Sequence, residues 1–483
     1  MDRLPEEVLQ IIFSTFLPDV DVCLIRHGPC IARPLLYHTI YAFYNTTRWL
    51  LIRTLIENPA LGQHTRTIVI SHEPEMMLRP HAKIHPDMLR HAVMKAQGRP
   101  GYPSRLMSKF LCCIEKGTVD SAESTFPLAF LPNLDQMFLY LPGDYFNAIN
   151  IFSIITREIA SSRDEARSSE GIPPAQLISA SHFSKLRKIR VGCTMVGLLA
   201  KYNEFTAQLV KLPNLRSFAS YQNTWSEEAL RRAPGTIGIH NLILGNPRMT
   251  GEDLLYLLSK CPNLRGLKIT FGYCERYIDR PYLPAIGDML RNGPFNLETL
   301  ILETSKMSAG REIDTKHILG SLRPLQKLTK LHLPLDILAG LRACAYDDSV
   351  EGEHQRYSLN IDQQLPHSLE IVDFEVFSLG HNRTNVYIHN QVMNLISNEY
   401  RINLRAVQVG NEINTVSVEY IRNVGRPGWS VICRNTSSEF NLENLLDNWP
   451  IISQGLVDIS YTAPDLDIPR SHVGWLVDIR HDC

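Results

Sequence analysis

Hydrophobic residues recur along most of the chain as triplets with the spacing L-x-x-L-x-L, and the positions between them are often polar or basic. The clearest triplets are Leu264/Leu267/Ile269, Leu297/Leu300/Leu302 and Leu328/Leu331/Leu333. Weaker ones are Thr65/Ile68/Ile70, Leu134/Met137/Leu139, Leu186/Ile189/Val191, Leu215/Phe218/Ser220, Ile239/Leu242/Leu244, Leu369/Val372/Phe374 and Leu404/Val407/Val409. The last two positions of a triplet are two residues apart, so in a short strand both side chains point to one face, which we expect to be buried.

Three triplets are preceded by the same short sequence, [LC]-P-N-L. It occurs at residues 131–134, 212–215 and 261–264. Recurrence of one lead-in before one triplet favours internal repeats. The segments between triplets supply candidate outer helices, best seen at residues 250–260, where Thr250 is the expected N-cap.

The distances between triplets are irregular. From Leu186 onward their first positions are 29, 24, 25, 33, 31, 41 and 35 residues apart. The short steps match leucine-rich repeats of about 20–29 residues, and the long steps indicate loop insertions. We therefore predict an α/β fold, an irregular leucine-rich-repeat solenoid with a curved parallel sheet inside and helices outside. The variable spacing leaves open a generic α/β domain with parallel strands and crossover helices.

Some segments fall outside the repeat pattern. Residues 161–176 and 346–364 are polar and look inserted, and residues 97–105 form a turn-rich connector. The triplets fade beyond Gly410. Residues 415–420 and 429–433 are strand-like, and we expect residues 411–483 to form a terminal cap.

The N-terminal segment, residues 4–17, reads as one helix. Pro5 suits its first turn, two glutamates follow at the positive end of the helix dipole, and Pro18 stops it. Its apolar side chains occupy an arc of roughly 240°, whereas an ordinary surface helix needs only about 100°. The excess indicates either a second protein surface that covers the helix or a helix buried on all sides as a cap of the solenoid.

The sequence L-P-E-E-V-L-Q-I-I-F at residues 4–13 resembles the first helix of the F-box, and residues 34–40 resemble its exit in fungal-type F-box proteins. The cysteine at Cys261 resembles the cysteine-containing repeats of the same proteins. Such F-box domains dock on the Skp-type adaptor of cullin-RING ubiquitin ligases. By matching positions, the resemblance implies these adaptor-binding residues: Leu4, Pro5, Val8, Leu9, Ile11, Ile12 and Phe13.

The resemblance implies three parts: an F-box-like helical module at residues 1–45, the leucine-rich-repeat solenoid at 46–410 and the C-terminal cap or extension at 411–483. The chain would recruit a target protein to an SCF-type ubiquitin ligase, with the module on the adaptor and the solenoid on the target. The segment between Leu17 and Pro34 is shorter than in the family. It favours the alternative, a non-ligase interaction scaffold that keeps a decayed F-box.

Composition and charge limit the classes of partner and the cellular compartment that we expect. The 49 basic and 50 acidic side chains nearly cancel, so we expect neither nucleic acid nor an anionic membrane as partner. No stretch approaches the ~20 apolar residues of a membrane span, and no signal-like segment is visible. The ten cysteines include no C-x-x-C pair, which favours reduced thiols. We expect a cytoplasmic or nuclear protein.

Catalytic motifs are missing from the sequence. It contains no phosphate-binding glycine loop, no G-x-S-x-G and no H-E-x-x-H. His81, His85 and His91 lie close together, but Pro80 and Pro86 prevent a shared helical face. The acidic residues of 347–353 read as a solvated loop rather than a cation site. A GTPase regulator or hydrolase would need a catalytic arginine or nucleophile that no pattern reveals, so we expect no enzyme, cofactor or metal.

Overall fold

The computed structural model describes part of the chain. The described ranges are residues 37–42, 51–55, 58–71, 130–141, 184–193, 214–221, 236–247, 249–271, 282–304, 318–339, 360–375, 391–398, 400–411, 416–423, 429–435 and 457–461, with single residues between some of them. These residues form an α/β fold, a solenoid-like stack of mostly parallel strands. The chain divides into two compact units: residues 1–249 with 260–263, and residues 250–259 with 264–483.

The first unit contains parallel strands that follow one another in chain order. They are β1 (Thr39–Ala42), β2 (Thr67–Ser71), β3 (Gln136–Leu141), β4 (Lys188–Cys193), β5 (Ser217–Tyr221) and β6 (Asn241–Gly245). A 3-10 helix, η1 (Pro59–Gln63), precedes β2. Because β1 pairs with β2, the sheet already begins at Thr39, inside the range assigned to the helical module.

The second unit also begins with parallel strands in chain order, and one of its later strands runs antiparallel. Its strands are β7 (Gly266–Phe271), β8 (Thr299–Thr304), β9 (Lys330–Pro334), β10 (Ile371–Glu375), β11 (Ala406–Asn411), β12 (Val416–Arg422), β13 (Trp429–Asn435) and β14 (Val457–Tyr461). Strands β7 to β11 are parallel, β12 is antiparallel to both neighbours, and β14 runs parallel to β13. The strands expected at 415–420 and 429–433 are thus confirmed as β12 and β13.

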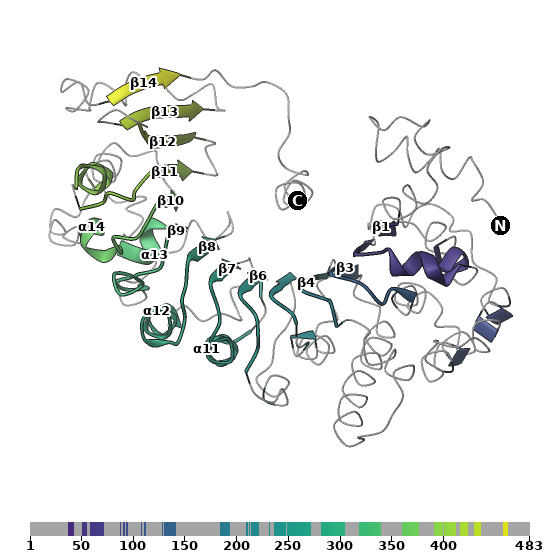
Figure 1. Ribbon diagram of the computed structural model, residues 1–483. Coiled ribbons are helices and arrows are strands. Elements are labelled where there is room, and N and C mark those ends of the chain that lie inside the picture. The colour runs from purple at the N-terminus through teal and green to yellow at the C-terminus, as the bar shows by residue number, and fades with distance from the viewer. Residues whose placement is uncertain are drawn as a thin grey trace, which may run out of the picture. The chain divides into compact units, whose positions relative to one another are not determined.

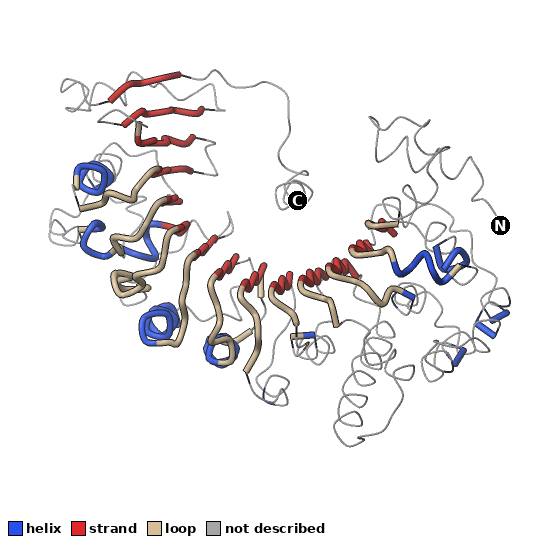
Figure 2. Tube along the Cα trace, in the orientation of Figure 1, coloured by secondary structure: helices blue, strands red, loops and turns tan. Residues whose placement is uncertain are grey.

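Helices of the second unit lie on one side of its strands. They are α11 (Gly251–Ser259), α12 (Tyr282–Asn292), α13 (Leu335–Ala339), α14 (Ile361–Gln364) and a helix at residues 391–397. Figure 1 shows α11 and α12 side by side, and Figure 2 shows the loops that lead from such helices to the strands. No helix in the described ranges is long and apolar enough to cross a membrane.

All ten predicted triplets coincide with strands, and each strand from β2 to β11 begins two residues after the first triplet position. Every triplet side chain is buried, including the polar Thr65 and Ser220. Pairing keeps equivalent positions in register: Leu267 lies opposite Leu300, and Leu300 opposite Leu331. The inward half of the pattern is therefore confirmed, and columns of triplet side chains form a large part of the described core of each unit.

The backbone extends this register into the turn before each strand. The N–H groups of Glu298 and Thr299 both donate to the carbonyl of Arg265, and those of Thr329 and Lys330 both donate to the carbonyl of Glu298. The same pair of bonds recurs at every junction from β1 to β6 and from β7 to β11. Each repeat thus satisfies the backbone donors of the next, although the loops between them differ in length.

The asparagine of the [LC]-P-N-L lead-in has a physical role. The Asn133 side-chain amide donates to the carbonyl of Gln63, at 2.8 Å, and the Asn214 amide donates to the carbonyl of Ser184. Both carbonyls lie two residues before the first triplet position of the preceding repeat. In two of the three lead-ins, the asparagine therefore bridges successive turns.

Helix α11 begins as expected at Thr250. The Thr250 Oγ1 accepts a hydrogen bond from the Asp253 N–H at 3.1 Å, and the Asp253 carboxylate accepts from the Thr250 N–H and hydroxyl. This reciprocal arrangement is a capping box with aspartate at the third position. The polar segment 346–364 is not a loop throughout, because α14 and its N-cap Asn360 occupy its end.

Candidate protein-interaction surface

The strand positions between the triplet residues form the second face of each sheet. In the second unit the register aligns one row across five strands: Lys268, Ile301, His332, Asp373 and Gln408. All five side chains are half-buried. This row is the part of the described sheet where functional groups are both ordered by the backbone and accessible to a partner.

At one end of the row, a lysine and a carboxylate pair across adjacent strands. The Lys268 ammonium lies 2.8 Å from one oxygen of Glu303, and the Thr270 hydroxyl donates to the other oxygen at 2.8 Å. Side-chain exposures of 32% for Lys268 and 27% for Glu303 leave both charges within reach of water or a ligand. The carboxylate is held in one orientation by two donors.

The centre of the row is a histidine–aspartate pair. The His332 Nδ1 lies 2.7 Å from an oxygen of Asp373 on the neighbouring strand. Burial lowers the pKa of His332, but the hydrogen bond to Asp373 and the charges of Asp373, Glu303 and Glu375 outweigh it, so that the pKa lies above its ordinary value. The described part of this face therefore carries both basic and acidic groups, with Lys268 and His332 next to Glu303 and Asp373.

The side chains at the corresponding positions of the first unit are more buried. Val69, Phe138, Arg190 and Ala219 occupy the same row and are all buried. The Arg190 guanidinium lies 5.4 Å from the centre of the Phe138 ring, and the Lys188 ammonium lies 6.0 Å from it. These cation–π contacts satisfy part of the buried charge, so this row contributes to packing more than to a free surface.

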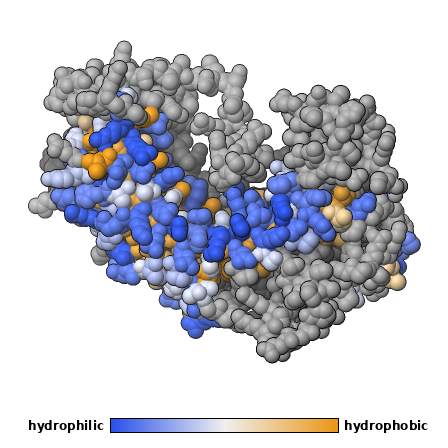
Figure 3. Space-filling model, in the orientation of Figure 1, coloured by the Kyte–Doolittle hydropathy of each residue, from blue (hydrophilic) through white to orange (hydrophobic). Residues whose placement is uncertain are grey.

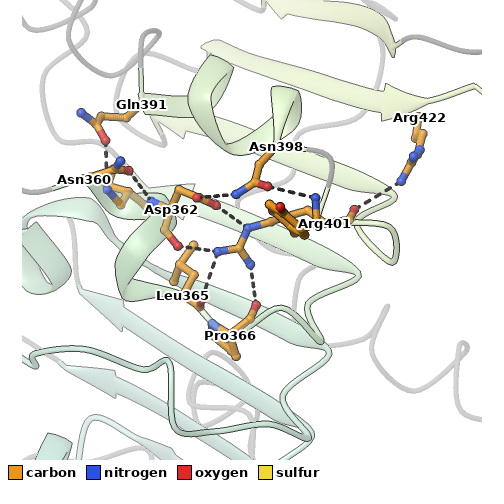
Figure 4. Close-up of polar contacts among 10 residues, drawn as sticks. Asn360, Asp362, Leu365, Pro366, Gln391, Asn398, Arg401 and Arg422 are labelled. Atoms are coloured by element: carbon orange, nitrogen blue, oxygen red, sulfur yellow. Dashed lines mark hydrogen bonds and ion pairs between the residues drawn. The ribbon is translucent and has the colours of Figure 1, made fainter.

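A buried arginine organises the turn before β11 (Figure 4). The Arg401 guanidinium pairs with the Asp362 carboxylate and also donates to the backbone carbonyls of Asp362, Leu365 and Pro366. The Asn398 side chain donates to the same carboxylate. The Arg401 side chain is only 1% exposed, so these groups stabilise the fold and offer no site for chemistry.

The residues singled out for adaptor binding, Leu4, Pro5, Val8, Leu9, Ile11, Ile12 and Phe13, lie outside the described residues. So do His81, His85 and the acidic residues of 347–353, while His91 is described and exposed. Within the described ranges no group of three histidine, cysteine or acidic side chains could hold a metal ion. Cys261 is a free thiol, and burial raises its pKa to about 12.

Sequence patterns located the strands that carry the candidate row but not the row's chemistry. The triplet rule fixes which positions point away from the core, so Lys268, His332 and Asp373 could have been read as outward-facing. Their pairing depends on the register between strands that are 33 to 41 residues apart in the chain. No local signal reveals such a pair.

Comparison with known proteins adds no relative. A scan against models of protein families gave no match, and a search of curated proteins gave none either.

Proposed function

We propose that this chain is the substrate-recruiting subunit of an SCF-type ubiquitin ligase. Its N-terminal F-box-like helix binds a Skp-type adaptor, and its leucine-rich-repeat solenoid binds a target protein. The observation that carries the proposal is the F-box-like sequence at residues 4–13 in a chain whose following strands repeat in register. In this function the protein holds a target near the transferase and carries out no covalent step itself.

The outward row of the second unit supports the target-binding half of the proposal. Register places Lys268, His332 and Asp373 in one line. Hydrogen bonds hold the Asp373 carboxylate of the row and the adjacent Glu303 carboxylate in fixed orientations. A folded or extended protein segment that lies along the row meets donors and acceptors at a regular spacing. The half-buried state of these groups lets a partner complete their desolvation.

The adaptor-binding half is tested by co-purification of a Skp-type adaptor with the full chain. Val8→Asp/Ile12→Asp introduces two charges on the apolar surface of the helix and should abolish co-purification, since burying an unpaired carboxylate is costly. Gln10→Asp is the matched control, because the F-box motif leaves that position variable. It should retain the adaptor. Equal thermal denaturation of all three proteins excludes loss of the fold, and a wild-type chain that binds no adaptor overturns the proposal.

The alternative is a non-ligase interaction scaffold with a decayed F-box. The short segment between Leu17 and Pro34 favours it. The two functions differ in one measurable property: a ligase subunit binds an adaptor as well as its protein partner, and the scaffold binds the partner alone. Binding of a partner without co-purification of an adaptor would identify the scaffold.

A further inference from the structure

The turn before β11 carries a charged residue at a position where the turns before β5 and β9 carry leucine. Three residues before the first triplet position, Leu212 and Leu325 are buried, and each accepts a backbone hydrogen bond from that first position. Arg401 occupies the equivalent position, accepts the same bond from Leu404 and is 2% exposed. A charged side chain thus fills a place that leucine fills elsewhere.

The two residues that flank Arg401 have large side chains, and both are exposed. Tyr400 is 80% exposed and Ile402 is 72% exposed. Most of the described surface visible in Figure 3 is hydrophilic, so two large apolar side chains in one turn depart from the rest. Exposing tyrosine and isoleucine is unfavourable for the isolated chain, and local conflicts of this kind are expected at functional or strained positions.

Hydrogen bonds hold the backbone of the turn on both sides of Arg401. The Arg401 guanidinium is bound by Asp362 and three carbonyls, and the Tyr400 N–H donates to the Asn398 side chain. From β12, Arg422 donates to the Ile402 carbonyl at 2.8 Å. A partner that binds here does not have to order the turn first, and this preorganisation lowers the cost of binding.

Two arginines lie beside the exposed pair. The Arg422 N–H donates to the Arg405 carbonyl at 2.8 Å, and the antiparallel register of β11 and β12 sets the two residues opposite each other. Like charges in directly opposed positions repel. Glu370 offsets them weakly, since its carboxylate is 3.8 Å from the Arg405 guanidinium, which is 76% exposed. Among the described residues, the carboxylate of Asp362 is already paired with Arg401.

We infer that Tyr400, Ile402, Arg405 and Arg422 form a docking surface for a segment of a partner protein that carries an apolar side chain flanked by carboxylates. The apolar side chain covers Tyr400 and Ile402, and the carboxylates accept hydrogen bonds from the two guanidinium groups. A nucleic-acid phosphate would engage the arginines and leave Ile402 in water. The inference rests on the proposed function only in taking the bound protein to be a target for ubiquitin transfer.

A displayed library of random peptides, selected against the immobilised full chain, tests the docking surface. Peptides with aspartate or glutamate next to an aliphatic or aromatic residue should be enriched on the wild type and not on Tyr400→Ser/Ile402→Ser. Labelled copies of the enriched peptides should bind at least about tenfold more weakly to that variant and to Arg405→Glu/Arg422→Glu, as expected for central interface residues. The matched control Met94→Ser/Arg323→Glu changes an exposed methionine and an exposed arginine elsewhere, and it should bind as the wild type does.

Three outcomes overturn the inference. Enriched peptides without acidic residues contradict the charge argument, and peptides that bind the Tyr400→Ser/Ile402→Ser variant unchanged contradict the location. Concentration-dependent dimerisation that the same variant abolishes would assign the surface to a second copy of the chain. Co-purification of the adaptor tests the ligase function and does not test the docking surface. A chain that binds no adaptor but selects acidic peptides overturns the ligase function and leaves the docking surface standing.

Discussion

At the scale of single residues, Arg401 shows how one charged side chain can be buried in an apolar repeat. Removing a guanidinium from water is costly, and the cost is recovered only if every donor finds an acceptor. Here the Asp362 carboxylate and the carbonyls of Asp362, Leu365 and Pro366 supply the acceptors. The pair also joins α14 to the turn before β11, two elements that no backbone ladder connects.

Arg401→Leu should lower the free energy of unfolding by about 3–5 kcal/mol, because it leaves the partly buried Asp362 carboxylate without its cation. Arg401→Leu/Asp362→Asn should recover part of that loss, since no unpaired charge remains. Urea unfolding followed by circular dichroism measures both values. If the double variant were less stable than the single one, the pair would not be the cause of the loss.

At the scale of elements, the strands were predictable and several other elements were not. In a strand with one buried face, apolar side chains recur every second residue. The last two residues of each triplet have this spacing, so β2 to β11 could be predicted from the sequence. Strand β1 has only Ile40 as a large inward side chain, too little for a pattern. Helix α14 lies in a segment whose polar composition indicated a loop, and its place depends on Arg401, 39 residues away in the chain.

The residues of the candidate row could not be grouped from the sequence, for a related reason. Outward strand positions carry no hydrophobic period, so nothing in the chain relates His332 to Asp373 before the register of β9 and β10 is known. Helix α11 is the opposite case. Its N-terminus is encoded within four residues, and Thr250 and Asp253 form the hydrogen bonds that the sequence predicts.

Thr250→Ala should therefore destabilise the protein by about 1 kcal/mol, because the Asp253 N–H loses its side-chain acceptor. Thr250→Ser keeps the hydroxyl and should stay close to the wild type. The free energies come from urea unfolding, and amide hydrogen exchange should be faster in the first turn of α11 for the alanine variant alone. Equal losses in both variants would assign the effect to the threonine methyl group instead.

At the scale of the whole molecule, columns of triplet side chains run through the described core, and each strand pairs with the strands of neighbouring repeats. In such an array stability is close to a sum of repeat energies and nearest-neighbour terms. A defect should therefore stay local. Phe218 is the second residue of its triplet in the first unit, and Phe374 is the third residue of its triplet in the second unit. Both are large and fully buried, which makes them suitable probes.

Phe218→Ala should cost about 3–5 kcal/mol through lost burial and the cavity it leaves. Because neighbouring strands share that cavity, amide hydrogen exchange should accelerate in β4, β5 and β6 and stay unchanged in β9, β10 and β11. Phe374→Ala should give the reverse, and the double variant the sum of the two patterns, since the residues lie in separate units and share no neighbours. Acceleration of exchange in all these strands by either single substitution would instead show that the described repeats unfold as one cooperative body, in which the energy of a repeat is not a local quantity.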